Sequence, residues 1–150
     1  MPKVITPKSF GAPLGMYSHG MAAPAGELVV VAGQVGVGRD GQVVPGVVPQ
    51  TRQALENVGA VLAAAGCGFR DVVRLQTFLV SADDIPGFMR ARQEVFPGYF
   101  PDEAYPPNTL LVVSRLVRPE LRVEIEAMAV RRPRRPTVRK RVQPRKRARR

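Results

Sequence analysis

The chain has 150 residues, which is enough for one domain with a packed core. Hydrophobic residues make up 45% of it, a share that excludes a wholly disordered chain. Its formal charge of +11 is typical of a nucleic-acid-binding protein, but twelve of its 23 lysines and arginines lie in residues 131–150. Residues 1–130 hold eleven basic and twelve acidic residues and are nearly neutral. We therefore predict a domain over residues 1–130 and a basic, disordered tail over residues 131–150.

The composition also excludes several kinds of site. One cysteine, Cys67, leaves no partner for an internal disulfide, and one histidine, His19, leaves too few ligands for a zinc site. No apolar run approaches the ~18 residues that a membrane span needs, and the N-terminus lacks the apolar core of a signal peptide. We predict a cytoplasmic domain with no metal and no membrane partner.

The first half of the chain predicts a loop-rich start with three strands, one of them optional, followed by one helix. Residues 1–25 are rich in Gly, Pro and Ala and are expected to contain one short strand at most. A β-branched run over residues 27–33 predicts a buried strand, and Asp-Gly at 40–41 predicts a tight turn. Apolar residues at i, i+3 and i+4 spacing predict a helix over residues 49–65, which Gly66 ends.

The second half predicts three strands and a second helix. Residues 71–80 alternate as a strand does, and a helix is expected to begin near residues 81–83 and to end at Pro97. The nearly continuous apolar run over residues 108–114 predicts a strand covered on both faces. Residues 122–130 alternate strictly and predict the last strand.

These elements predict an α+β fold: a single six-stranded mixed sheet with two helices packed on one face. The other face of such a sheet would expose Phe78, Met128 and half of the run over residues 110–113, too much apolar surface for a monomer. We therefore expect self-association through that face. Glu124 and Glu126 would lie within or beside the contact.

Five short segments, in this order and spacing over residues 12–130, resemble the RidA (YjgF) family of enamine/imine deaminases. Each segment is weak evidence alone, and their order and spacing carry the resemblance. The matching segments are LGMYSHG at 14–20, VAGQ at 31–34, QTRQALENV at 50–58, AAG at 64–66 and VEIEA at 123–127.

The resemblance implies a chorismate-mutase-like domain that forms a homotrimer with ligand clefts between subunits. It also implies hydrolysis of a 2-imino or 2-enamino acid to the 2-keto acid and ammonia without a cofactor. Such chemistry needs an arginine that binds the substrate carboxylate and a carboxylate that orients or deprotonates water.

The resemblance also assigns site residues. Tyr17 matches the cleft tyrosine, Gly33 the glycine whose backbone faces the ligand, and Glu124 the catalytic, water-orienting glutamate. Asn108 stands where the family has its carboxylate-binding arginine. An amide offers hydrogen bonds without charge, so the usual 2-imino acids are expected to bind poorly unless another arginine, Arg74 or Arg115, reaches the site.

Other interpretations stay open. The protein is a hydrolase of an enamine, an imine or a small carbonyl compound, or a non-catalytic metabolite-binding or regulatory trimer. Glu124 could instead pair with Arg74 at an interface, Tyr17 could cap a sheet edge, and Asn108 could be a strand-start residue. The tail over residues 131–150 either binds nucleic acid or another polyanion weakly and in a salt-sensitive way, or has no function.

Overall fold

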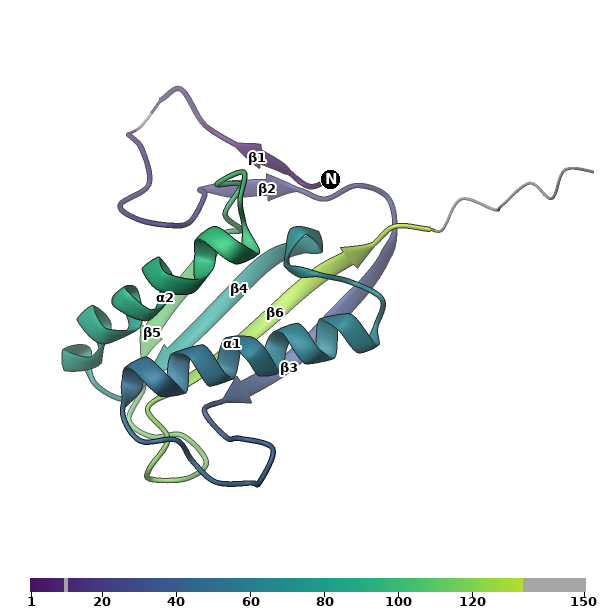
Figure 1. Ribbon diagram of the computed structural model, residues 1–150. Helices are drawn as coiled ribbons and strands as arrows, with labels where there is room; N and C mark the ends of the chain where they lie inside the picture. The colour runs from purple at the N-terminus through teal and green to yellow at the C-terminus, as the bar shows by residue number, and fades with distance from the viewer. Residues whose placement is uncertain (10, 134–150) are drawn as a thin grey trace, which may run out of the picture.

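The computed structural model describes residues 1–9 and 11–133, and the predicted tail from residue 134 onward lies outside the described residues. Helices α1 and α2 cover one face of a four-stranded sheet of order β3-β6-β4-β5, and a two-stranded sheet β1-β2 lies beyond its end (Figure 1). Short 3-10 turns precede β4 and α2. The bounds are β1 (Lys3–Ile5), β2 (Gly20–Ala22), β3 (Glu27–Val35), α1 (Val47–Ala64), β4 (Val72–Leu79), α2 (Ile85–Tyr99), β5 (Asn108–Val112) and β6 (Val123–Arg131).

The prediction of one six-stranded sheet is wrong, because the strands divide into a sheet of four and a sheet of two. The N-terminal segment pairs only with itself, β1 against β2, in three residue pairs. Prolines at positions 2, 7, 13 and 24 interrupt the N–H donors that a longer ladder would need. The segment after β3 turns at Gly41, which has φ +77°, and forms a single bridge between Val37 and Val43 instead of a strand. The predicted mixed sheet and the two helices on one face are confirmed, since β4 and β5 run parallel and the other pairs antiparallel.

Helix α1 begins two residues before the predicted start, with Pro49 in its first turn, where the missing N–H costs no intrahelical bond. It ends as predicted at Gly66, which has φ +73°. The Gly66 N–H donates to Ala63 O and the Cys67 N–H to Leu62 O, the pair of bonds that defines a Schellman motif.

Helix α2 does not end at Pro97 as predicted, but continues to Tyr99. A proline inside a helix costs about 3 kcal/mol or more. The aromatic side chains on either side of it offset that cost, because Phe96 and Phe100 are buried and their rings lie 5.1 Å apart in an edge-to-face contact. The Phe100 N–H also donates to Phe96 O at 2.7 Å and closes the last turn.

The alternation predicted for the last strand is confirmed in β6 up to Ala129, after which Val130 is also buried. Its residues Val123, Ile125, Ala127 and Ala129 face the helices and are buried, while Glu124, Glu126 and Met128 are half-buried on the opposite face. Strand β4 supplies Leu75, Thr77 and Leu79 to the covered face, and an irregularity in its pairing with β6 near Val72 places that residue, not Val73, in the core.

The face away from the helices, which we call the open face, has no cover in the single chain. Leu28 and Val30 of β3 are 59% and 62% exposed, and Leu111 of β5 is 43% exposed. Phe78 and Met128 lie between them, half-buried. This arrangement confirms the apolar exposure predicted for one chain. Because β5 is covered on one face only, the prediction of a strand covered on both faces is wrong for the single chain.

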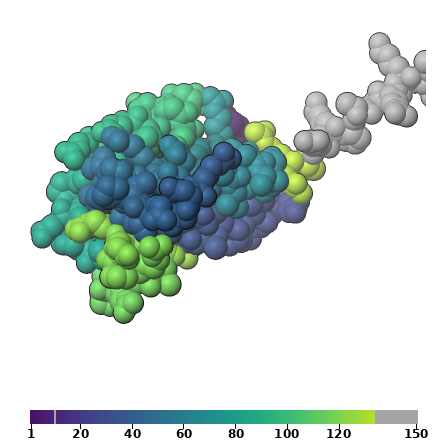
Figure 2. Space-filling view, turned by 60° about the horizontal axis from the view of Figure 1, so that its bottom comes forward, coloured from purple at the N-terminus to yellow at the C-terminus, as the bar shows by residue number. Residues whose placement is uncertain are grey.

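The loop between β5 and β6 projects from the body beside α1, as a space-filling view shows (Figure 2). Gln50 of α1 holds the base of this loop, because its side-chain amide donates to Glu120 O and accepts from the Arg122 N–H. Arg122 also donates to both carboxylate oxygens of buried Asp84, which joins the loop to the start of α2. In the part of the chain that the structure describes, no helix has the length and apolar character of a membrane span.

Candidate ligand-binding site

Gly33 and Glu124 lie against each other across strands β3 and β6. The register of this strand pair shifts between Val31 and Gln34, and Gly33 lies inside the shift. A Cβ atom built on Gly33 would lie 1.8 Å from Oε1 of Glu124, far inside van der Waals contact. Only glycine leaves room there for the carboxylate to rest on the β3 backbone. The structure thus brings two of the four predicted site residues together.

The Glu124 carboxylate is half-buried on the open face, with Phe78 as its neighbour on β4. Within the described residues, neither a hydrogen bond nor an ion pair engages it, and the predicted alternative of a pair with Arg74 is not formed in one chain. Arg74 instead donates to Oε1 of Gln76, two residues along its own strand. The carboxylate is therefore free to accept a proton or a hydrogen bond from water or a ligand.

A small hollow of about 100 Å³ lies next to this pair on the open face. Its polar lining is Arg74 and Gln76 of β4 and Glu126 of β6, and Ala32, beside Gly33, forms part of its wall. A volume of this size holds a few water molecules, since each occupies about 30 Å³ in the liquid. The open face therefore combines apolar surface with a compact polar centre.

Asn108 lies on the other side of the sheet. It begins β5 beside Leu75 of β4, and its Oδ1 accepts a hydrogen bond at 3.0 Å from Oγ1 of Thr77, a residue 1% exposed on the covered face. Glu124 points to the open face and is separated from β5 by the whole of β4. Two strand spacings are about 10 Å. One chain therefore does not place Asn108 and Glu124 in the same site.

Tyr17 lies in the loop between β1 and β2, and its hydrogen bonds and ring contact are made within that loop. Its hydroxyl accepts a hydrogen bond from the Leu14 N–H at 3.3 Å, and its ring meets that of His19 edge-on at 6.1 Å. His19 has a loop position, as expected, with Nε2 2.8 Å from Gly11 O. The predicted site residues thus occupy three separate places: the Gly33–Glu124 pair, Asn108 and Tyr17.

The sequence analysis missed Arg92 of α2, which is only 2% exposed. Its guanidinium carbon lies 4.3 Å from the Phe96 ring centre and 5.4 Å from that of Phe88, and its Nη2 donates to the carbonyl oxygen of Met16. Its Nε has no acceptor among the described residues. Burial lowers the pKa of Arg92 to about 10, so the side chain stays charged at neutral pH. A signal was present, since Arg92 lies four residues from Phe88 and from Phe96 and so belongs to the apolar stripe of α2.

The remaining candidates are Cys67, Arg115 and a metal site, and the described residues of one chain show no catalytic or metal-binding arrangement at any of them. Burial, and then the nearby Asp71 carboxylate, raise the pKa of the Cys67 thiol, so it is a poor nucleophile at neutral pH. Arg115 donates from Nε to the neighbouring Leu116 O in the β5–β6 loop. A search of residues 1–9 and 11–133 finds no cluster of three His, Cys, Asp or Glu side chains that could hold a metal ion.

Comparisons with known proteins agree with this architecture. The family profile described as Endoribonuclease L-PSP matches residues 8–131. A RutC family protein of Pyrococcus horikoshii is 37% identical over 131 residues, which cover 86% of this chain and 98% of that protein. The 2-iminobutanoate/2-iminopropanoate deaminase of Mus musculus is 38% identical over 133 residues, 87% of this chain and 93% of the mouse protein. The crystal structure of the Rid family protein YyfB from Yersinia pestis, of unknown function, has a TM-score of 0.74 at 32% identity and covers 86% of this chain and 98% of its own.

A mixed sheet with two helices on one face is thus an α+β architecture that this chain shares with the Rid protein YyfB. The chain belongs to the endoribonuclease L-PSP family, to which the RidA (YjgF) proteins belong, as its sequence motifs predicted.

Proposed function

We propose that this protein is a cofactor-independent hydrolytic deaminase of an enamine, an imine or a related small carbonyl metabolite, with Glu124 as its catalytic residue. The observation that carries the proposal is the contact between the Glu124 carboxylate and the space left by Gly33. A carboxylate held on a strand backbone and free of internal partners is suited to general base catalysis on water. Relatives that are 31% to 38% identical and bear the name of 2-iminobutanoate/2-iminopropanoate deaminase support the same reaction class.

In the proposed reaction Glu124 accepts a proton from a water molecule whose oxygen adds to the carbon of the C=N bond. Glu124 passes that proton to the nitrogen, which gives a neutral carbinolamine. Glu124 then accepts the proton of the carbinolamine hydroxyl and transfers it to the nitrogen as the C–N bond breaks, so that the C=O bond forms and ammonia leaves. Water supplies the oxygen of the carbonyl product, so no oxidant or cofactor takes part. The backbone at Gly33 would face the ligand beside this carboxylate, with Tyr17 and Asn108 as further binding residues.

The proposal includes a homotrimer. Leu28, Val30 and Leu111 give the open face more exposed apolar surface than an isolated chain usually keeps. A second copy packed on this face would bury it and could bring its own Tyr17 or Asn108 to the first copy's Glu124. We propose three subunits in a closed ring because of the resemblance to the RidA family. Measurement of the oligomeric state tests this number.

The substrate differs from the usual 2-imino acids in this proposal. Asn108 has no charge and is already bonded to Thr77, while Arg74 and Arg115 donate to Gln76 and Leu116. A carboxylate placed as in 2-iminopropanoate would therefore lack its charged, bidentate partner. We propose a substrate whose acid group is absent or differently placed, formed and consumed in the cytoplasm.

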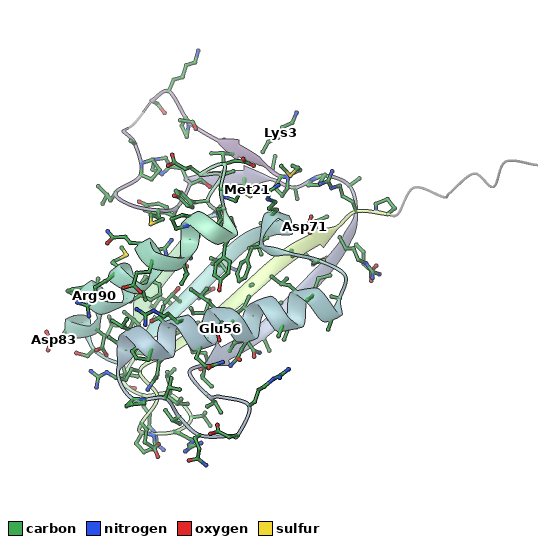
Figure 3. All side chains as sticks on the ribbon, viewed as in Figure 1. Lys3, Met21, Glu56, Asp71, Asp83 and Arg90 are labelled. Atoms are coloured by element: carbon green, nitrogen blue, oxygen red, sulfur yellow. The ribbon has the colours of Figure 1, made fainter. Side chains whose placement is uncertain are left out.

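The test is ammonia release from 2-iminopropanoate generated enzymatically and from neutral imines of similar size. Wild type is expected to hydrolyse the neutral imines, and Glu124→Ala to lower kcat/KM about a hundredfold or more. Glu56→Ala, which removes an exposed glutamate on α1, is the matched control and should match wild type (Figure 3). Activity on 2-iminopropanoate that appears only in Asn108→Arg would support the altered substrate class.

The main alternative is a metabolite-binding or regulatory trimer that performs no reaction. It predicts ligand binding without turnover, and a Glu124→Ala variant that keeps its full biological effect. Weak polyanion binding by residues 131–150 remains a separate prediction from charge. It requires that removal of residues 134–150 abolish retention on DNA or RNA at low salt.

A further inference from the structure

Arg92 carries a buried charge that the packing of the fold does not require. Its side chain is 2% exposed between the rings of Phe88 and Phe96, and no carboxylate in the described part of the chain pairs with it. A buried charge without an acidic partner is costly, and a hydrophobic residue of similar volume is often as stable or more so. A methionine or leucine would fill this space on α2. The presence of arginine therefore calls for a role outside core packing.

Arg92 makes two hydrogen bonds, a local one from Nη1 to Sδ of Met89 at 3.8 Å and a long-range one, and the long-range bond identifies that role. Its Nη2 donates to the carbonyl oxygen of Met16, 76 residues earlier in the chain. Three other hydrogen bonds of this segment are local: Leu14 N–H to the Tyr17 hydroxyl, Tyr17 N–H to Gly15 O, and Ser18 Oγ to Gly20 O. Arg92 thus ties a locally bonded loop to a rigid helix of the main domain.

The bonded carbonyl controls the residue that follows it. The Met16 C=O and the Tyr17 N–H belong to one planar peptide group. A hydrogen bond that fixes the carbonyl therefore also fixes the direction of the Tyr17 N–H. The N–H end of the same group is held by Gly15 O at 2.8 Å. With its carbonyl and its N–H both bonded, the peptide group between Met16 and Tyr17 is held in one orientation.

We propose that Arg92 is a positioning residue that holds the loop carrying Tyr17 in its ligand-facing orientation. This inference rests on the proposed function, in which Tyr17 binds the ligand. Arginine suits the task because its planar guanidinium can stack on an aromatic ring and donate from its edge at the same time. Lysine keeps the charge and a donor but not the stacked, planar geometry, so Arg92→Lys should restore the contact only in part.

The direct test is cleavage of the full chain by chymotrypsin after Tyr17, followed by mass spectrometry. Arg92→Met is expected to speed this cleavage about tenfold or more, because loss of a charge-assisted hydrogen bond increases the open population by that order. The unfolding midpoint should stay at or above the wild-type value. Arg92→Lys should fall between Arg92→Met and wild type.

Arg90→Met is the matched control, since Arg90 is an exposed arginine on the same helix (Figure 3). It should cleave at the wild-type rate. Equal cleavage after Tyr17 in wild type and Arg92→Met would overturn the inference. So would a lower unfolding midpoint with faster cleavage at all chymotryptic sites together, which would show a general structural role.

A double-mutant cycle on imine hydrolysis tests whether Arg92 acts through Tyr17. Arg92→Met is expected to raise KM about tenfold, and Arg92→Met combined with Tyr17→Ala to be no worse than Tyr17→Ala alone. Additive losses would overturn the inference. If wild type hydrolyses no imine, the proposed function fails, and cleavage after Tyr17 still decides the role of Arg92.

Discussion

The two faces of the four-stranded sheet are built from alternate residues of the same strands, yet they have opposite characters. The covered face presents Leu75, Ile125 and Ala127 to the helices, and all three are buried. The open face presents Glu124 and Glu126 among exposed apolar residues of the outer strands. One face therefore supplies the core of the chain, and the other is the face that we propose for association and for the candidate chemistry.

The largest expected effect comes from placing the same charge on each face. Ile125→Asp should leave the chain unfolded, because an unpaired carboxylate in the core costs several kcal/mol of a total stability of about 5–15 kcal/mol. Val30→Asp should stay folded, since Val30 is 62% exposed, but should dissociate into single subunits. Circular dichroism measures the fold, and analytical ultracentrifugation measures the assembly.

Val30→Lys places a positive charge at the same position and should also dissociate the assembly. It controls for repulsion between an aspartate at position 30 and the nearby carboxylate of Glu126. A Val30→Asp protein that remains oligomeric at high dilution would contradict the assignment of the open face as the subunit interface. An Ile125→Asp protein that folds normally would contradict the division between the two faces.

A smaller effect on stability but a large one on activity is expected at Gly33. The atoms nearest to the Cβ of Gly33→Ala would be those of the Glu124 side chain, from Cγ to Oε1, and not backbone atoms, so the side chain can rotate away. The free energy of unfolding should change by less than about 1 kcal/mol. Deaminase activity should fall about a hundredfold, because the Glu124 carboxylate is displaced from its position against the β3 backbone.

Gly26→Ala is the matched comparison at the other end of β3. Its Cβ would lie 2.5 Å from Arg131 O, a backbone atom that cannot swing away, so unfolding should become easier by about 1–3 kcal/mol. Activity per folded molecule should be retained. Urea unfolding and ammonia release together separate the two outcomes, and equal losses of activity in both variants would count against a role for the Gly33–Glu124 contact.

The smallest expected effect is at Thr77, the polar residue of β4 on the covered face. Thr77→Val keeps the shape but removes the hydrogen bond to Asn108, and should lower the free energy of unfolding by about 1 kcal/mol. Sedimentation should be unchanged, because the open face is untouched. A Thr77→Val variant that dissociates would show that the covered face also controls assembly. Thr77→Ser, which keeps the hydroxyl, is the control.

Most of the helices and strands could be predicted because their signals are local. The alternation of residues 122–130 predicted the buried side chains of β6 except Val130. The spacing of α1 predicted most of its buried apolar face, although Val61 is 38% exposed and the polar Thr51 is buried. The end of α2 could not be predicted, since the cost of Pro97 is local whereas the offsetting burial of Phe96 and Phe100 depends on the whole core. The division of the strands into two sheets could not be predicted either, because it depends on pairing between segments that are distant in the sequence.

The candidate site shows the same limit. Motifs predicted the individual residues, but not that Gly33 lies against Glu124, that Asn108 faces the opposite side, or that Arg92 is buried beneath Met16. The sequence by itself determined the family, the element pattern and most of the burial on the two faces of β6, because periodicity is a local property and the order of motifs is read directly along the chain. Only the tertiary structure decided which distant side chains meet, because those contacts follow from strand register and packing, which no single segment encodes.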